Sequence, residues 1–229
     1  MNVVILQPSY IPWRGYFHQI QKADLFVFYD CVQYDKNGWR NRNTIKMMQG
    51  SQWLSIPVKT KGCVRDGKSI KDVPIVWDDP WNKKHSQTIQ QNYAKSPFLK
   101  TYLPLLEAIY SRRDALLADF TCSTTELIAR ELGIQHTKFI RSSSIGAEGA
   151  KTDRLLTILK KVGATHYISG PSAQEYIERE KFDEAGISLE FMAYSYREYP
   201  QLFGDFQPQV SILDLLFNVG PNAWQYIWG

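Results

Sequence analysis

Residues suited to holding an anionic ligand gather between Gln7 and Phe17, a segment that reads QPSYIPWRGYF. Its arginine can grip phosphate or carboxylate oxygens, and its tyrosine and tryptophan rings suit a ligand groove. Its glycine has no Cβ and would let a nucleotide base or ribose approach the backbone closely. The residues expected to contact a ligand are Gln7, Tyr10, Trp13, Arg14 and Gly15. The alternative, which we favour for Phe17, is that the rings form only the core face of an amphipathic helix.

A second polar segment runs from Asp30 to Lys46, and its residues 36–46 hold four cations and no acid. Arginine forks bind anions through two hydrogen bonds, and asparagine both donates and accepts. Further ligand contacts are therefore expected at Gln33, Arg40, Asn41, Arg42 and Asn43. Asp30 is a candidate general base or acceptor for a ribose hydroxyl. An ion pair between Asp30 and an arginine that fixes the segment is an equally strong alternative.

Two later motifs add polar groups. The run WNKKH, residues 81–85, opens a predicted helix. His85 is the histidine best suited to proton transfer, because neighbouring cations such as Lys84 could hold an acyl or phosphoryl group. Its alternative is a purely structural histidine. The SGPS loop could bind phosphate through backbone amides, with Ser169 and Ser172 as added donors. Alternatively, Ser172 only caps a helix that starts near Ala173.

The elements that position these motifs alternate between strands and helices. The apolar run from Val3 to Leu6 predicts a buried strand, and apolar residues at helical spacing predict a helix over residues 13–23. A second apolar run over residues 25–29 completes a parallel βαβ unit. The same alternation continues along the chain. It predicts an α/β fold with a mainly parallel sheet, helices on both faces, and one domain over residues 1–229.

The polar segments follow the first two predicted strands. Ligands of open α/β sheets bind outside the carboxyl ends of the strands. We therefore expect several of the selected side chains to converge on one cleft. This set consists of Tyr10, Arg14, Asp30, Arg40, Arg42 and His85.

Composition narrows the classes of protein. Of the 229 residues, 44% are hydrophobic and 22% are charged, which is typical of a globular chain and excludes a disordered one. The net charge of +4 divides into +9 over residues 1–113 and −5 over residues 114–229. This asymmetry points to an anionic ligand, with a solvated basic face as an equal alternative. A pI of about 8.8 and the lack of a recognition motif disfavour a nucleic-acid partner.

Targeting and metal signals are also lacking. No apolar run is long enough to cross a bilayer, and the N-terminus has no charged leader, so we expect a cytoplasmic protein with no membrane partner. The three cysteines, Cys31, Cys63 and Cys122, are scattered, so neither a disulfide framework nor a metal site is expected. The sequence is compatible with a homo-oligomer.

With these residues in view, the sequence resembles the WbqC-like family. The resemblance rests on QPSYIPWRGYF, the stretch over residues 23–45, the WNKKH run, YISGPSA and the late segment FGDFQPQVSILDLLFNVG. It covers essentially the whole chain, and the first two motifs are highly specific. It implies a place in surface-polysaccharide or O-antigen biosynthesis, and a glycine (aminoacyl) transferase role is suggested for members.

The first motif is also similar in spacing to the QPSGxxHxGNY signature of tryptophanyl-tRNA synthetase-like nucleotide binders. This similarity implies a Rossmann-like, nucleotidyltransferase/HUP-like βαβ unit at the N-terminus. Trp13-Arg14-Gly15-Tyr16 stands where those enzymes carry their histidine element, and no KMSKS-like loop follows. Adenylyl transfer by that machinery is therefore not expected.

Together, these expectations describe a transferase of surface-glycan assembly with an anionic substrate, acting by aminoacyl or acyl transfer to a nucleotide-linked sugar. The charged portion would be held by Arg14, Arg40, Arg42, Lys84 and His85, and Asp30 or His85 would move the proton. The cofactor expected is a nucleotide or a nucleotide-linked donor. The alternative is a non-catalytic module that binds nucleotide sugars or glycans and needs neither Asp30 nor His85.

Overall fold

The computed structural model describes residues 1–59 and 67–229, so Cys63 lies outside the described ranges. At the centre is a five-stranded sheet in the order β5-β2-β1-β6-β7. Its strands are β1 (Asn2–Leu6), β2 (Leu25–Phe28), β5 (Lys138–Arg141), β6 (His166–Ser169) and β7 (Ser188–Phe191). Every neighbouring pair is parallel, which confirms the predicted α/β fold with β1 inside the sheet. Counted along the chain, the strand order is 3-2-1-4-5, which is Rossmann-like.

Both faces of the sheet are buried, which explains why β1 and β2 read as unbroken apolar runs. Successive side chains of a strand point to opposite faces. Val4 and Phe26 accordingly pack into one hydrophobic core, and Val3 and Val27 pack into a second core on the opposite face. The side chains of β1 and β2 are therefore fixed from both sides, and the loops that follow these strands start from a rigid base.

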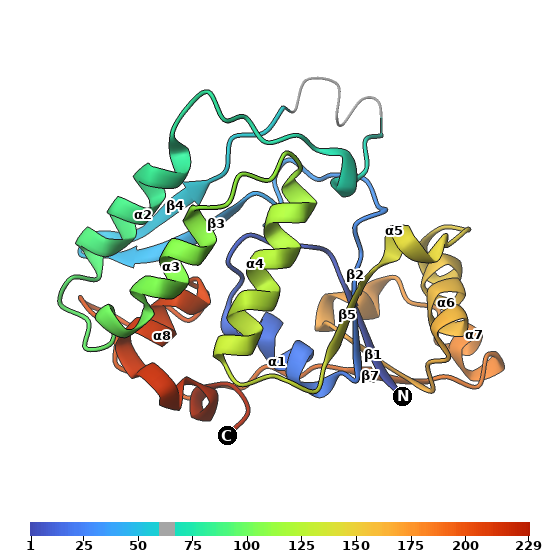
Figure 1. Cartoon of the computed structure of the whole chain (residues 1–229). Helices are drawn as coiled ribbons and strands as arrows, with labels where there is room; N and C mark the ends of the chain where they lie inside the picture. Colours follow the sequence, from blue (N-terminus) through green and yellow to red (C-terminus); the bar gives the residue numbers. More distant parts are fainter. Residues whose placement is uncertain (60–66) are drawn as a thin grey trace.

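Helices cover the two faces, as predicted. In Figure 1, α1 and α4 lie on one side of the sheet, and α6 and α7 lie together on the other. The α-helices are α1 (Arg14–Lys22), α2 (Trp81–Asn92), α3 (Leu103–Tyr110), α4 (Leu117–Glu131), α5 (Ser142–Ile145), α6 (Lys151–Val162), α7 (Arg179–Glu184) and α8 (Ile212–Val219). Short 3-10 helices are η1 (Ile70–Asp72), η2 (Lys100–Tyr102), η3 (Pro171–Glu175) and η4 (Gly220–Tyr226). A bilayer-crossing helix is not found among the described residues.

An antiparallel hairpin beside the sheet was not predicted. It consists of β3 (Arg42–Met47) and β4 (Gly50–Ser55). The polar segment from Asp30 to Lys46 therefore ends in a strand, and Lys46 at its end is buried. Figure 1 shows this hairpin next to α2, on the same side of the molecule as α3 and α8.

Candidate functional site

A cavity of about 630 Å³ opens at the carboxyl ends of three strands of the parallel sheet. Leu6 and Gln7 reach it from the end of β1, Tyr29 from the end of β2, and Ser169 and Gly170 from the end of β6. β1 has β2 on one side and β6 on the other, so the strand order reverses here. This is the topological switch point at which open α/β sheets bind their ligands.

The walls of this cavity are aromatic and basic. Seven rings line it: Trp13, Tyr16, Tyr29, Trp39, Tyr167, Tyr176 and Tyr194. Arg40 and Lys151 are the charged residues of its described lining, to which no aspartate, glutamate or histidine belongs. Over residues 1–59 and 67–229, no group of three or more potential metal ligands occurs. The cavity thus suits an anionic ligand that carries a flat, apolar part.

Arg40 keeps part of its hydrogen-bonding capacity unused. Its Nη1 donates to Ser9 Oγ at 3.3 Å and to the carbonyl of Pro8 at 3.5 Å. Its Nε is buried and has no hydrogen-bond partner among the described residues. Burial lowers the pKa of Arg40 from its usual value, and attraction by Tyr16 and Asp35 offsets only part of this effect. A half-buried guanidinium in this state is stabilised by an incoming anion.

The loop between β1 and α1 is held in an unusual conformation. Ile11 has a φ of 35°, a left-handed value that is rare for a β-branched residue and indicates strain. Asn43 holds this loop, because its Nδ2 donates to the carbonyls of Tyr10 at 3.0 Å and Ile11 at 2.8 Å. Ser9, Pro12 and Trp13 of the same loop line the cavity, so Asn43 positions one of its walls.

Gly15 contributes to the cavity through Trp13. A Cβ at Gly15 would clash with Cζ2 of the Trp13 indole. The space that we assigned from the sequence to a base or ribose is therefore filled by this indole. The Trp13 ring also meets the ring of Tyr194 edge to face, at a centroid distance of 5.0 Å.

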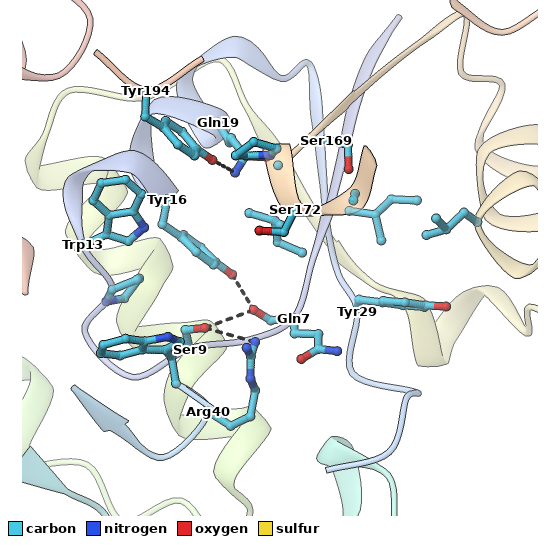
Figure 2. A pocket seen from close by; sticks show the side chains of 18 of the residues that line it. Gln7, Ser9, Trp13, Tyr16, Gln19, Tyr29, Arg40, Ser169, Ser172 and Tyr194 are labelled. Carbon is cyan, nitrogen blue, oxygen red and sulfur yellow. Dashed lines mark hydrogen bonds between the residues drawn. The ribbon is translucent and has the colours of Figure 1, made fainter. Parts of the chain in front are cut away.

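Gln19 and Tyr194 form a polar pair in the wall. Figure 2 shows the Gln19 amide next to the Tyr194 hydroxyl, with Ser169 nearby, and Arg40 elsewhere in the cavity. Nε2 of Gln19 donates to Tyr194 Oη, and Oε1 of Gln19 is buried with no partner among the described residues. Sequence reasoning missed both residues. Gln19 follows Tyr16 by three positions and so shares its helix face, which was a usable signal, whereas nothing marked Tyr194.

Six of the residues predicted from the sequence line the cavity: Gln7, Trp13, Arg40, Asn43, Ser169 and Ser172. Ser172 lies inside the 3-10 helix η3, whose N-cap position is Gly170 and which has no side-chain cap. The alternative that Ser172 merely caps an α-helix is thus wrong. Ser169 Oγ donates to Tyr167 Oη at 3.3 Å, so its hydroxyl is held within the wall. Lys151, the first residue of α6, also lines the cavity.

Tyr10 and His85 lie in the core rather than in the cavity lining. Tyr10 is fully buried, and its hydroxyl bridges His85 Nδ1 at 2.9 Å and Tyr110 Oη at 2.6 Å. Burial lowers the pKa of His85 to about 4, so its imidazole is neutral at pH 7. Of the six side chains expected to share one cleft, the structure brings only Arg40 to the cavity. A catalytic role of His85 stays a prediction.

Asp30 is engaged by the start of α5. Its carboxylate accepts hydrogen bonds from Ser142 Oγ at 3.0 Å, from Ser143 N at 2.9 Å and from Ser143 Oγ at 2.8 Å. The side chain is fully buried, and it does not line the cavity. The alternative role, an ion pair with an arginine, is not seen among the described residues. Its placement is that of a group that ties β2 to α5, and its role as a general base stays a prediction.

Arg14 fastens the late part of the chain onto α1. Its Nη1 donates to the carbonyls of Arg197 at 2.9 Å and Tyr226 at 3.2 Å. Its guanidinium also lies over the rings of Tyr196 and Tyr199, at 4.7 and 5.3 Å from their centroids. Arg14 is buried and does not belong to the cavity lining.

The remaining predicted residues, Gln33, Asn41, Arg42 and Lys84, also lie outside the cavity lining. The Asn41 side chain binds the backbone: its Nδ2 donates to the carbonyl of Ile56 at 2.8 Å. The guanidinium of Arg42 lies over the ring of Trp53, 4.6 Å from its centroid. Lys84 pairs with a neighbouring exposed aspartate at 2.6 Å, and Gln33 is exposed.

The all-parallel sheet, its Rossmann-like strand order and the cavity at its switch point define an α/β protein of Rossmann-like topology. The chain belongs to the WbqC-like protein family, which it matches over residues 7–226. This match confirms the resemblance seen in the sequence. An uncharacterized protein of Mycobacterium tuberculosis, Rv1507c, is 40% identical over 228 residues, which cover 99% of this chain and 97% of that relative. No solved structure matches the chain.

Proposed function

We propose that the protein binds a nucleotide-linked sugar in the cavity and acts as a transferase in surface-polysaccharide or O-antigen biosynthesis. The observation that carries this proposal is the half-buried Arg40, with its unpartnered Nε, in a cavity whose described lining holds no acid. A guanidinium binds phosphate and carboxylate oxygens through parallel hydrogen bonds. The anionic part of the ligand is therefore assigned to Arg40, with Lys151 as the second cation.

The aromatic walls favour a ligand that also carries a ring. Trp13, Tyr16 and Tyr194 present large apolar surfaces and polar edges. A volume of about 630 Å³ lies within the roughly 300–1,000 Å³ typical of small-molecule sites. A nucleotide-linked sugar combines a flat base, a charged diphosphate and a polar sugar, and each part has a matching surface here.

The reaction we propose is acyl or aminoacyl (glycine) transfer to the sugar. A bond forms between the acyl carbon of an activated donor and an amino nitrogen or hydroxyl oxygen of the sugar. The bond from that carbon to its leaving group breaks, and the proton of the attacking group passes to the leaving group or to solvent. Support for this chemistry comes from the family resemblance, and support for the charged substrate comes from Arg40 and Lys151.

A non-catalytic module that binds nucleotide sugars is the second candidate. One observation favours it: no histidine, aspartate or glutamate is among the described residues lining the cavity. General acid–base catalysis most often uses these side chains. A binding module would need the rings and cations of the cavity and no proton-transfer group.

Binding is tested by titrating nucleoside diphosphates and nucleoside-diphosphate sugars into wild type and Arg40→Gln in a calorimeter. Loss of a charged hydrogen bond should weaken binding about ten- to a hundredfold. Arg130→Gln, which removes an exposed arginine on α4, is the matched control and should bind as wild type does. Equal affinities in wild type and Arg40→Gln would contradict the assignment of the anion to Arg40.

The two candidate functions are separated by mass spectrometry of the bound sugar after incubation with activated acyl and glycyl donors. A mass increase of the sugar that requires active wild-type protein indicates a transferase. Tight, Arg40-dependent binding without any modified sugar across the donor panel would favour the binding module.

A further inference from the structure

One buried acceptor of the described cavity lining has no hydrogen-bond partner among the described residues. Gln19 is 3% exposed and lines the cavity, and its Oε1 makes no hydrogen bond among the described residues. Buried polar groups of proteins are nearly always hydrogen-bonded, so an unpartnered one at a ligand site indicates what the ligand must offer. An unpartnered carbonyl oxygen requires a ligand donor, an N–H or O–H group.

The structure fixes the Gln19 amide in one orientation. Its Nε2 donates to Tyr194 Oη, and the Tyr194 ring is held by the edge-to-face contact with Trp13. Because that hydroxyl accepts from Nε2, its own proton is left for a second partner. Oε1 of Gln19 and the hydroxyl of Tyr194 thus present an acceptor beside a donor. A base edge with an N–H next to a ring nitrogen or carbonyl oxygen matches this pair.

The charge of the cavity decides which part of the ligand lies here. An acceptor oxygen repels the oxygens of a phosphate or carboxylate, which belong at Arg40. The rings around Gln19, those of Trp13, Tyr16 and Tyr194, favour a flat group. An ammonium group would need several acceptors, whereas Gln19 Oε1 is the unpartnered buried acceptor of the described cavity lining.

We infer that Gln19 determines which ligand the cavity accepts, by accepting a hydrogen bond from an N–H group of the nucleobase. This inference rests on the proposed function and names the base-reading residue of the same site. Gln19 selects the ring, and Arg40 holds the anion. The two residues should therefore affect different properties of binding.

The experiment compares a nucleoside diphosphate with its analogue methylated at the Watson–Crick N–H, for example uridine diphosphate and N3-methyluridine diphosphate. The pair is chosen from the nucleotide that binds wild type most tightly. Wild type should prefer the unmethylated ligand by about tenfold, the effect of one buried hydrogen bond. Gln19→Met, which keeps the length of the side chain but has no acceptor, should lose this preference. Arg40→Gln should weaken both ligands and keep the ratio.

Gln19→Glu supplies a further test, because a carboxylate offers acceptors only. This variant should keep the preference for the N–H base. If it loses the preference as Gln19→Met does, the free end of the amide is a donor and the inference is overturned. Inorganic pyrophosphate should bind Gln19→Met as it binds wild type, since it has no base.

The outcomes separate the inference from the proposed function. If nucleotides bind in an Arg40-dependent way and wild type does not distinguish the methylated analogue, the inference fails and the proposed function stands. That measurement needs wild type alone, so a variant that does not fold leaves the test intact. If wild type binds no nucleotide, both fail.

Discussion

His85 and Asp30, the side chains expected to move a proton, are both held by other groups of the protein. His85 Nδ1 contacts the Tyr10 hydroxyl, and the Asp30 carboxylate accepts from two serines at the start of α5. Neither residue lines the cavity. Both residues therefore make hydrogen bonds that join parts of the fold: His85 joins α2 to the loop after β1, and Asp30 joins the end of β2 to α5.

The buried His85 predicts a pH-dependent stability. Its folded-state pKa of about 4 lies below the value near 6.5 of an unfolded chain. As the pH falls from about 6.5 to about 4, the unfolded chain takes up a proton that the folded protein does not bind. The free energy of unfolding should therefore decrease over this window, by up to roughly 3 kcal/mol from this group.

The measurement is denaturant unfolding between pH 7 and pH 4 on wild type and His85→Gln. The variant should show a smaller decrease as the pH falls. His136→Gln replaces an exposed histidine and should keep the wild-type profile. Identical pH profiles for wild type and His85→Gln would show that His85 does not carry this dependence.

At the scale of elements, the loop between β1 and α1 decides the shape of the cavity. The strained Ile11 and the buried Asn43 belong to one arrangement, because Asn43 donates to the backbone carbonyls of Tyr10 and Ile11. This arrangement also couples the hairpin to the parallel sheet, since Asn43 lies on β3. The hairpin thereby supports the wall formed by this loop and also contributes Asn43 to the cavity lining.

Asn43→Ala should loosen this loop. Two buried carbonyls lose their donor, which should lower the free energy of unfolding by about 1–3 kcal/mol. Ligand affinity should fall as well, because Ser9, Pro12 and Trp13 lose their fixed positions in the wall. Denaturant unfolding and calorimetric titration measure the two effects, with the exposed Asn222→Ala as control. Unchanged affinity in a destabilised variant would separate the loop from the site.

The parallel sheet was predictable, whereas the hairpin and most of the cavity lining were not. Val3 to Leu6 and residues 25–28 are unbroken apolar runs, a pattern that two-sided burial produces directly. The hairpin strands read RNTIKM and GSQWLS, with no alternation strong enough to outweigh their polar residues. Tyr194 reaches the cavity only through tertiary packing, which no local pattern encodes.

On the scale of the whole molecule, Arg14 joins α1 to the last quarter of the chain. It was expected to hold a ligand, because a guanidinium can grip phosphate or carboxylate oxygens. Its partners are instead backbone carbonyls of residues 197 and 226 and nearby aromatic rings. A buried cation with neutral acceptors makes this attachment sensitive to substitution.

Arg14→Met should therefore release the late segment. We expect the free energy of unfolding to fall by about 2–4 kcal/mol, through lost charged hydrogen bonds and ring contacts. Limited proteolysis should then cut within residues 197–229 sooner than in wild type. Arg113→Met, which removes an exposed arginine that also stacks on a ring, is the control. Weaker ligand binding with unchanged proteolysis would instead support the ligand role predicted from the sequence.

The pairing of β1 with β6 has a consequence for the order of events in folding. It aligns Asn2 with His166, whereas β1 and β2 are joined by a single short helix. Pairing β1 with β6 closes a much longer stretch of chain than pairing β1 with β2, and it is therefore the slower step. The N-terminal βαβ unit can thus form while the β6 side of the cavity is still absent. A nascent chain that carries only the N-terminal βαβ unit then has the β1 and β2 walls of the cavity but lacks the wall that follows β6. The ligand should consequently slow unfolding of the completed protein without accelerating its folding.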